Sequence, residues 1–174
     1  MKKIIMITGG CRSGKSSYAQ RLALELSDTP VYMATSRVWD EEHRKRIQRH
    51  QQERGKEWAT IEEEKELSRH ELTGKVALVD CVTLWATNYF YDLDADVDRA
   101  LDALKQEFDK LAAQDAVLIM VTNEIGMGGV SADGLQQKFA DLQGWLNQYI
   151  AAKADEVYLM AAGIPVKIKW RVES

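Results

Sequence analysis

A glycine-rich segment, Gly9-Gly10-Cys11-Arg12-Ser13-Gly14-Lys15-Ser16, follows a short apolar run at residues 3–8 and opens an amphipathic stretch at residues 15–26. It has the spacing GxxxxGK[ST] of a P-loop, in the strand, loop and helix context that the pattern requires. In such a loop the backbone N–H groups point at phosphate oxygens, the lysine reaches the β- and γ-phosphates, and the serine hydroxyl can ligate Mg²⁺. We therefore predict that residues 9–16 bind nucleotide phosphates, with Lys15 catalytic and Ser16 a metal ligand.

Short apolar runs alternate with longer amphipathic runs along the rest of the chain. The pattern predicts strands at residues 3–8, 31–35, 76–80, 116–122, 156–160 and 166–169, and helices at residues 15–26, 40–54, 97–113 and 131–154. Continuously apolar strands suit a parallel sheet with helices on both faces, and the short turn at 161–165 predicts an antiparallel edge hairpin. We predict an α/β fold of the P-loop NTPase (RecA-like) class, with residues 1–174 forming a single domain.

Composition excludes several classes of protein. The 174 residues carry 23 Lys and Arg against 27 Asp and Glu, a net charge of −4, so the chain lacks the positive field that broad nucleic-acid binding needs. Two cysteines, Cys11 and Cys81, are too few for a secreted disulfide framework, which favours the reducing cytoplasm. No run approaches the roughly 20 apolar residues of a membrane-spanning helix, so we expect no membrane anchor.

A carboxylate stands at the end of the predicted strand 76–80. A P-loop is commonly accompanied by such a residue, which holds the metal from the far side, directly or through water. Asp80 therefore joins Ser16 as a predicted Mg²⁺ ligand, the alternative being a carboxylate that caps the next helix. Thr83 could bind phosphate or cap a helix. Together these features predict an enzyme or a switch that uses a Mg²⁺-bound nucleotide.

The base of the nucleotide is not determined by these motifs. The Asn/Thr-Lys-x-Asp element of regulatory GTPases is missing, and its nearest counterpart, Thr122-Asn123-Glu124-Ile125, does not match. The longer segment 122–129 contains polar groups and glycines at the expected ligand-binding edge of the sheet, where an acceptor would lie. A purely structural glycine loop is the alternative.

Two of the three histidines, His43 and His50, fall in the predicted helix 40–54, which has almost no apolar face. Packing would hold such a helix weakly, so we expect it to be exposed and mobile. The two histidines are too far apart for the i,i+4 spacing of a metal pair. Because an exposed histidine is usually only solvated, spacing alone leaves a catalytic role for His50 open.

Five segments in order form a more specific pattern: residues 8–16, residues 32–36, Arg46-Ile47-Gln48-Arg49-His50 with Arg54 and Trp58, residues 121–128, and residues 154–169. Together they resemble the bifunctional adenosylcobinamide kinase/adenosylcobinamide-phosphate guanylyltransferases of cobalamin biosynthesis. The resemblance implies that ATP or GTP phosphorylates adenosylcobinamide and that GMP from GTP is then transferred to the product, giving adenosylcobinamide-GDP. The histidine of the family motif matches His50, which implies a guanylyl-histidine intermediate.

The resemblance also implies a set of nucleotide contacts beyond the P-loop. These are Ala34, Thr35, Ser36, Gln51, Gln52, Glu53, Arg54 and Glu62. Glu62 would accept hydrogen bonds from guanine N–H groups. The chain has Arg49 where some members have a second histidine, and Asp80 where some have Glu, so His50 is the one candidate nucleophile while the shorter carboxylate could change the metal distance. Family members form homotrimers, and the downstream cobalamin synthase is a membrane protein that this chain could contact transiently.

Two alternatives remain open. A small-molecule kinase without guanylyl transfer predicts that replacing His50 leaves all activity intact, whereas a nucleotide-dependent switch predicts tight nucleotide binding without acceptor turnover. The bulky corrinoid needs a broad apolar surface, for which Trp39, Trp85, Tyr89 and Phe90 are candidates, although buried packing explains each equally well. The acidic run at residues 62–66 is expected to be a solvated helix face.

Overall fold

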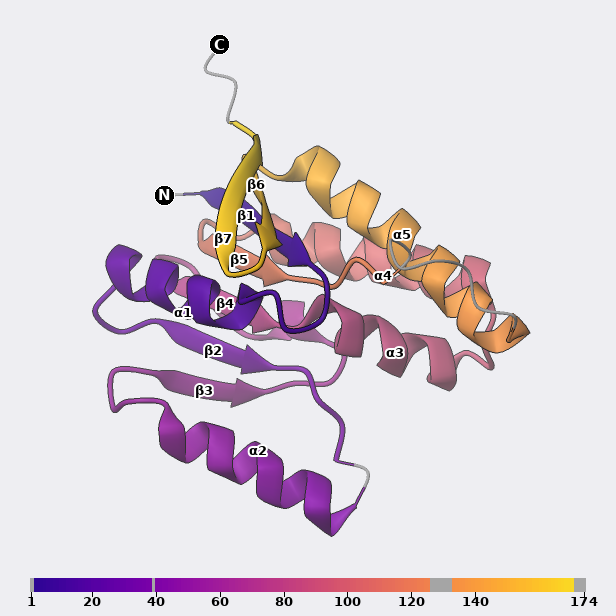
Figure 1. Ribbon diagram of the computed structural model, residues 1–174, viewed down its shortest axis with the longest axis horizontal. Helices are drawn as coiled ribbons and strands as arrows, with labels where there is room; N and C mark the ends of the chain where they lie inside the picture. The colour runs from indigo at the N-terminus through magenta and orange to yellow at the C-terminus, as the bar shows by residue number, and fades with distance from the viewer. Residues whose placement is uncertain (1, 39, 126–132, 171–174) are drawn as a thin grey trace.

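The computed structural model describes residues 2–38, 40–125 and 133–170. Within them seven strands form one sheet in the order β3-β2-β4-β5-β1-β6-β7 (Figure 1). The strands are β1 (Lys3–Gly9), β2 (Val31–Ala34), β3 (Ala59–Glu62), β4 (Val76–Asp80), β5 (Val117–Val121), β6 (Glu156–Ala161) and β7 (Ile164–Lys169). Every neighbouring pair is parallel except β6 and β7, which are antiparallel. The predicted mostly parallel sheet with a C-terminal edge hairpin is confirmed.

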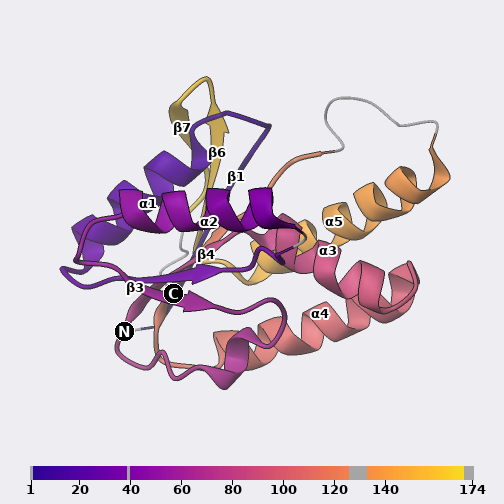
Figure 2. The ribbon, with the colours of Figure 1, turned by 90° about the horizontal axis from the view of Figure 1, so that it is seen from below.

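Helices cover both faces of this sheet. They are α1 (Lys15–Leu26), α2 (Glu41–Glu53), α3 (Val82–Asp92), α4 (Val97–Ala112) and α5 (Gly134–Lys153), with a short 3₁₀ helix η1 (Leu67–Arg69). Figure 2 shows α1 and α2 on one side of the sheet and α3, α4 and α5 on the other. None of these described helices combines the length and the apolar character needed to cross a membrane.

The central strand β5 shows how the core is divided between the two faces. All five of its residues are buried. Leu118 and Met120 belong to the cluster under α3, α4 and α5, while Val117, Ile119 and Val121 belong to the cluster that packs against α1. Because successive side chains alternate between faces, a strand buried on both sides must be apolar throughout.

Three regions differ from the sequence-based prediction. Strand β3 was not predicted, because it is an exposed edge strand with little apolar alternation. Helix α3 was not predicted either, since it begins directly after β4 and has apolar residues around much of its circumference. The acidic run 62–66 is not a helix face: Glu62 ends β3, and Glu63 Oε2 accepts hydrogen bonds from the backbone N–H groups of Lys65 and Glu66.

Helix α2 lies beside the edge strand β3, on the side of the sheet that carries α1 (Figures 1 and 2). Its first turn is capped by Asp40, whose Oδ1 accepts a 2.7 Å hydrogen bond from the backbone N–H of His43. All of its residues are described and none is buried. The expected exposure of the charged helix is therefore confirmed.

Candidate active site

The predicted P-loop connects β1 to α1 and is packed against the turn between β6 and β7. The N–H of Gly163 donates to Ser13 O at 2.9 Å. Gly14 has φ 94°, and a Cβ on it would lie 3.1 Å from Gly163 Cα. A Cβ on Gly9 would lie 2.7 Å from Ser13 Oγ and 2.8 Å from Met160 O. The loop therefore needs glycine at both positions, as the P-loop spacing predicts.

The remaining loop residues border solvent. Gly10, Cys11 and Arg12 are exposed, and Arg12 has a left-handed φ of 55°. The thiol of Cys11 is free, and Ser13 is buried. No side chain among the described residues caps α1 at Gly14, so the backbone N–H groups of its first turn are suited to donate to an anion.

Lys15 points back into this loop. Its Nζ donates to Gly10 O at 2.6 Å, within the loop that is predicted to bind phosphate. Burial lowers the pKa of Lys15, and the nearby acidic groups Cys81, Cys11 and Asp80 act in the opposite direction. A phosphate oxygen would replace the neutral carbonyl with a charged acceptor, which is the stronger partner for an ammonium group.

Ser16 and Asp80 come together as the sequence predicts. Ser16 Oγ donates to Asp80 Oδ2 at 3.2 Å, which joins the start of α1 to the end of β4. As potential metal ligands, Ser16 Oγ and Asp80 Oδ2 are both hard oxygen atoms. Mg²⁺ prefers such ligands when phosphate and water oxygens complete its coordination shell. The described residues contain no group of three or more His, Cys, Asp and Glu side chains suited to a metal. Ser16 and Asp80 thus fit a metal held mainly by the nucleotide, and not a dedicated protein cage.

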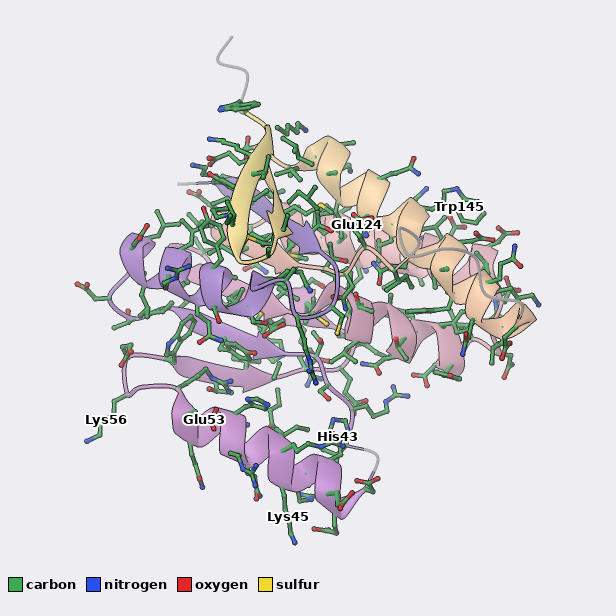
Figure 3. All side chains as sticks on the ribbon, in the orientation of Figure 1. His43, Lys45, Glu53, Lys56, Glu124 and Trp145 are labelled. Carbon is green, nitrogen blue, oxygen red and sulfur yellow. The ribbon has the colours of Figure 1, made fainter. Side chains whose placement is uncertain are left out.

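A cleft of about 590 Å³ runs from these two residues to helix α2. It is lined by Ser16, Ser17, Gln20, Tyr32, Ala34, Ser36, His43, Arg46, Ile47, His50, Glu53, Arg54, Asp80 and Leu84. The side chain of His50 is 72% exposed, and its Nδ1 lies 3.7 Å from Glu53 Oε2. Figure 3 shows His43 and Glu53 on the sheet side of α2, whereas Lys45 points away. The structure therefore brings His50 and the P-loop serine to one cleft.

Of the eight nucleotide contacts that the family resemblance implies beyond the P-loop, four line this cleft. Ala34, Ser36, Glu53 and Arg54 line the cleft. Ser36 Oγ lies 2.8 Å from His43 Nε2.

The other four implied contacts, Thr35, Gln51, Gln52 and Glu62, do not line the cleft. Thr35 is buried, and its hydroxyl donates to Cys81 O at 2.7 Å and accepts from Cys81 N at 3.0 Å, so it joins β2 to the end of β4. Gln51 Nε2 donates to Glu62 Oε1 at 2.6 Å, which ties α2 to β3, and Gln52 is exposed.

Sequence reasoning gave no role to Tyr32, which lines the cleft beside Asp80. Its hydroxyl donates to Asp80 Oδ2, and its ring carries the Arg54 guanidinium 3.6 Å from the ring centroid. The Trp58 ring meets it edge-on, with centroids 5.8 Å apart. The alternation of β2 puts Tyr32 on the same face as Ala34, but only the pairing of β2 with β4 shows that this face also carries Asp80.

The predicted acceptor segment is described only as far as Ile125, and residues 126–129 lie outside the described residues. Thr8 Oγ1 donates to Glu124 Oε1 at 2.8 Å, and the N–H of Glu124 donates to Gly9 O at 3.0 Å, which holds Glu124 beside the P-loop (Figure 3). Thr83 does not cap α3, whose N-cap is Cys81; its Oγ1 accepts a hydrogen bond from Asn123 N at 3.1 Å, and its phosphate contact stays a prediction.

The aromatic candidates for a corrinoid surface belong largely to the core. Trp85, Tyr89 and Phe90 are 0%, 7% and 1% exposed, and Trp85 Nε1 donates to Lys65 O at 2.8 Å. Trp39 lies outside the described residues. Buried packing, the second explanation considered for these side chains, therefore applies to the three that are described.

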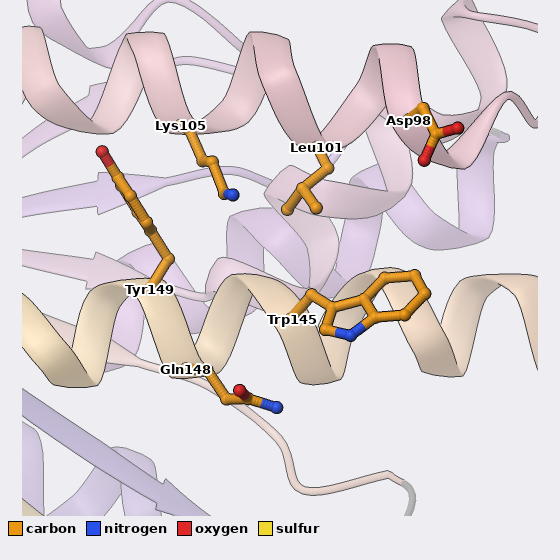
Figure 4. Close-up of a pocket in the computed structure, with 6 residues that line it drawn as sticks. All are labelled: Asp98, Leu101, Lys105, Trp145, Gln148 and Tyr149. Carbon is orange, nitrogen blue, oxygen red and sulfur yellow. The ribbon is translucent and has the colours of Figure 1, made fainter.

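A second hollow, of about 450 Å³, lies between α4 and α5 (Figure 4). It is lined by Asp98, Leu101, Lys105, Trp145, Gln148 and Tyr149. None of the predicted phosphate-binding residues contributes to it, and its helices cover the face of the sheet opposite α1 and α2 (Figure 2). Of these two hollows, only the cleft between α1 and α2 is lined by a predicted phosphate-binding residue, Ser16.

Comparison with known proteins shows the family of this chain. The sequence model of the cobinamide kinase / cobinamide phosphate guanyltransferase family matches residues 5–168. The bifunctional adenosylcobalamin biosynthesis protein CobU of Escherichia coli is 39% identical, over 95% of this chain and 99% of its own length. The corresponding protein CobP of Pseudomonas aeruginosa is 38% identical, over 94% and 96%.

Among solved structures, the flagellar accessory protein FlaH from Methanocaldococcus jannaschii superposes with a TM-score of 0.50 at 14% sequence identity, covering 97% of this chain and 79% of that protein. This likeness concerns the fold, and the predicted P-loop NTPase (RecA-like) class is confirmed. The sequence relatives confirm the family resemblance. The chain therefore belongs to the cobinamide kinase / cobinamide phosphate guanyltransferase family and is an enzyme.

Proposed function

We propose that this protein phosphorylates adenosylcobinamide with ATP or GTP and then transfers GMP from GTP to the adenosylcobinamide phosphate through a guanylyl group on His50. The family supports the cobinamide kinase and guanylyltransferase activities. The observation that carries the His50 step is that one cleft is lined by His50, by the P-loop residue Ser16 and by Asp80. This shared lining supports the proposal that a nucleotide held by the P-loop reaches the space that His50 borders.

In the kinase step the acceptor hydroxyl attacks the γ-phosphorus. The new oxygen–phosphorus bond forms as the bond to the β-phosphate oxygen breaks, and the hydroxyl proton passes to solvent or to a nearby base. Lys15 Nζ donates a hydrogen bond to Gly10 O in the structure. With nucleotide bound it would donate to the phosphate oxygens instead and balance the negative charge that builds up on the leaving nucleoside diphosphate. The uncapped start of α1 would add backbone N–H donors to the same phosphates.

In the guanylyl step the nucleophile is a neutral imidazole. Glu53 Oε2 lies 3.7 Å from Nδ1 of His50. On closer approach it would accept a hydrogen bond from a proton at Nδ1, which would leave the Nε2 lone pair for attack on the α-phosphorus. The phosphorus–nitrogen bond forms as pyrophosphate leaves. An oxygen of adenosylcobinamide phosphate then attacks the same phosphorus, the phosphorus–nitrogen bond breaks, and the imidazole is restored with adenosylcobinamide-GDP as product.

We propose Mg²⁺ as the cofactor, because Ser16 and Asp80 supply oxygen ligands at the P-loop. When bound, Mg²⁺ would neutralise charge on the β- and γ-phosphates. We also propose the P-loop residues, Ala34, Ser36, Glu53 and Arg54 as nucleotide contacts, and Glu62 as a guanine acceptor once Gln51 releases it.

Several properties of the whole protein are proposed on the family resemblance. These are a single transferase domain over residues 1–174, a homotrimer, a cytoplasmic location, a transient contact with the membrane-bound cobalamin synthase, and no role for nucleic acid. The net charge of −4 supports the last of these. All seven described strands contribute to one sheet, which supports the single domain.

Acceptor turnover tests the overall reaction. Purified protein is incubated with adenosylcobinamide, Mg²⁺ and ATP, then with GTP, and the corrinoids are separated by reversed-phase chromatography and identified by mass. The proposal predicts adenosylcobinamide phosphate first and adenosylcobinamide-GDP after GTP is added. A reaction that stops at the phosphate would instead indicate a kinase without guanylyl transfer, and an unchanged corrinoid with tightly bound nucleotide would indicate a switch.

A further inference from the structure

We propose that Tyr32 is a positioning residue, which holds the Asp80 carboxylate beside Ser16 and couples it to the C-terminal end of helix α2. The proposal rests on the nucleotide and metal roles of Ser16 and Asp80 given above. Tyr32 lies in the segment 32–36 of the family pattern, but the sequence motifs assign this side chain no role. Two independent contacts carry it, one made by the hydroxyl of Tyr32 and the other by its ring.

The hydroxyl contact restrains the carboxylate. Tyr32 Oη and Ser16 Oγ both donate to the same oxygen of Asp80, Oδ2. An ionised carboxylate only accepts hydrogen bonds, so Tyr32 must be the donor. A tyrosine hydroxyl is protonated at physiological pH and so has a hydrogen to donate. If the Ser16 hydroxyl turns toward a bound metal, Tyr32 still restrains the carboxylate.

The ring contact reaches helix α2. Arg54 follows the last residue of α2, and its backbone N–H donates to His50 O at 3.3 Å. Its guanidinium lies 3.6 Å from the centroid of the Tyr32 ring, a cation–π distance. Arg54 Nε is buried without a hydrogen-bond partner among the described residues, so the ring is a principal contact of this group. Since α2 has no buried residue of its own, this contact ties the turn that carries His50 to the sheet.

A tyrosine that merely fills space would show neither relationship. Tyr32 is 8% exposed, and its ring also meets Trp58 edge-on, so part of its role is packing. Its hydroxyl, however, donates to Asp80, the one carboxylate predicted to bind the metal. A phenylalanine ring at this position would make the same packing contacts without that hydrogen bond. Removal of the hydroxyl alone therefore separates positioning from packing.

The first test measures metal binding without turnover. Mn²⁺ serves as the probe, and its free concentration is followed by electron paramagnetic resonance. GDP is the bound nucleotide, because guanylyl transfer with pyrophosphate as the leaving group cannot occur from it. We expect Tyr32→Phe to weaken Mn²⁺ binding roughly five- to tenfold, the effect of one charge-assisted hydrogen bond. GDP affinity in EDTA should stay within about twofold of the parent, since the phosphate contacts of the P-loop are unchanged.

Tyr149→Phe is the matched control. It also removes a hydroxyl that bonds a carboxylate, Tyr149 Oη to Asp109 at 2.7 Å, but on α5 and away from the cleft. Its Mn²⁺ affinity should equal that of the parent. Equal Mn²⁺ affinity in Tyr32→Phe and parent would overturn the proposal, and so would an equal loss of GDP affinity in EDTA, because that result indicates a structural defect.

A double-mutant cycle with Asp80→Asn gives a second measurement. If Tyr32 acts through Asp80, the two substitutions together should weaken Mn²⁺ binding no more than Asp80→Asn alone. Additive losses of Mn²⁺ affinity would contradict the coupling between Tyr32 and Asp80. Parental Mn²⁺ affinity in Asp80→Asn would also overturn the proposal, because Asp80 would then not bind the metal. None of these readouts needs guanylyl transfer, so a failure of the proposed function at His50 is distinguishable from a failure here.

Amide hydrogen exchange tests the ring contact. Tyr32→Phe keeps an aromatic platform for Arg54, whereas Tyr32→Leu removes it. Exchange in α2 should therefore be faster in Tyr32→Leu than in Tyr32→Phe, while strands β1 and β5 exchange alike in the two variants. Equal exchange in α2 for both variants would show that the ring does not hold the helix.

Discussion

Ser16 Oγ and Asp80 Oδ2 lie 3.2 Å apart, although 64 positions separate the two residues in the chain. The contact forms because β1 and β4 both flank β5, so that their carboxyl ends lie at the same edge of the sheet. The P-loop supplies the hydroxyl and β4 supplies the carboxylate. Two short sequence features thereby meet at the site that we propose for a nucleotide and its metal.

The carboxylate of Asp80 should be required for turnover and not for folding. We expect Asp80→Asn to lower the rate of adenosylcobinamide phosphorylation by roughly 100-fold, because a charged ligand is lost where transition-state charge is balanced. Asp80→Glu, the residue found in some family members, should stay within about tenfold of the parent. Initial rates across a Mg²⁺ titration check this, and equal rates for parent and Asp80→Asn would exclude a metal role.

The close approach at Gly9 predicts a stability effect that Gly10 lacks. A Cβ at Gly9 would clash with Ser13 Oγ and Met160 O, and φ there is 154°. We expect Gly9→Ala to lower the free energy of unfolding by about 2 to 4 kcal/mol. A Cβ at Gly10 meets no described atom within 4 Å, so Gly10→Ala is the control. Urea denaturation measures both, and equal stabilities would contradict the packing described here.

The ion pairs of Glu156 predict a dependence of stability on acid. Burial of Glu156 opposes ionisation, but hydrogen bonds from Lys167, Lys3 and Tyr158 outweigh it and lower its pKa to about 2. Since the folded pKa lies below the unfolded value of about 4.3, the stabilisation is complete above that value and is lost as pH falls toward 2. The difference in unfolding free energy between parent and Glu156→Gln should therefore shrink between pH 5 and pH 2. A difference that is constant over this range would contradict the assignment.

Glu62 tests how guanine is recognised. Its Oε1 now accepts from Gln51 Nε2 at 2.6 Å, so the carboxylate already receives a donor of the kind that guanine would offer. We expect Glu62→Ala to lower GTP affinity roughly tenfold while affinity for ATP, whose base has neither the N1–H nor the 2-amino group of guanine, changes little. Gln51→Ala is the control, because it removes the competing donor and keeps the acceptor. Parallel losses for GTP and ATP would show that Glu62 does not contact these guanine groups.

The sequence predicted the centre of this fold better than its edges. The strands 3–8, 76–80 and 116–122 were recognisable because burial on both faces makes them apolar throughout. The edge strand β3 has no such requirement, and α3 is too apolar to show a helical period. The P-loop was readable because its chemistry depends on local spacing. Tyr32 was not, because its relation to Asp80 depends on which strands pair.

The most direct test of the account is covalent labelling of His50. The protein is mixed with Mg²⁺ and GTP labelled on the α-phosphate, without acceptor, and then denatured so that only covalent label remains. His43→Asn is the matched control, since His43 lies on the same helix and lines the same cleft. We predict acid-labile label on the parent and on His43→Asn and none on His50→Asn. Label that persists in His50→Asn, or no label on a parent shown to bind GTP, would contradict guanylyl transfer through His50.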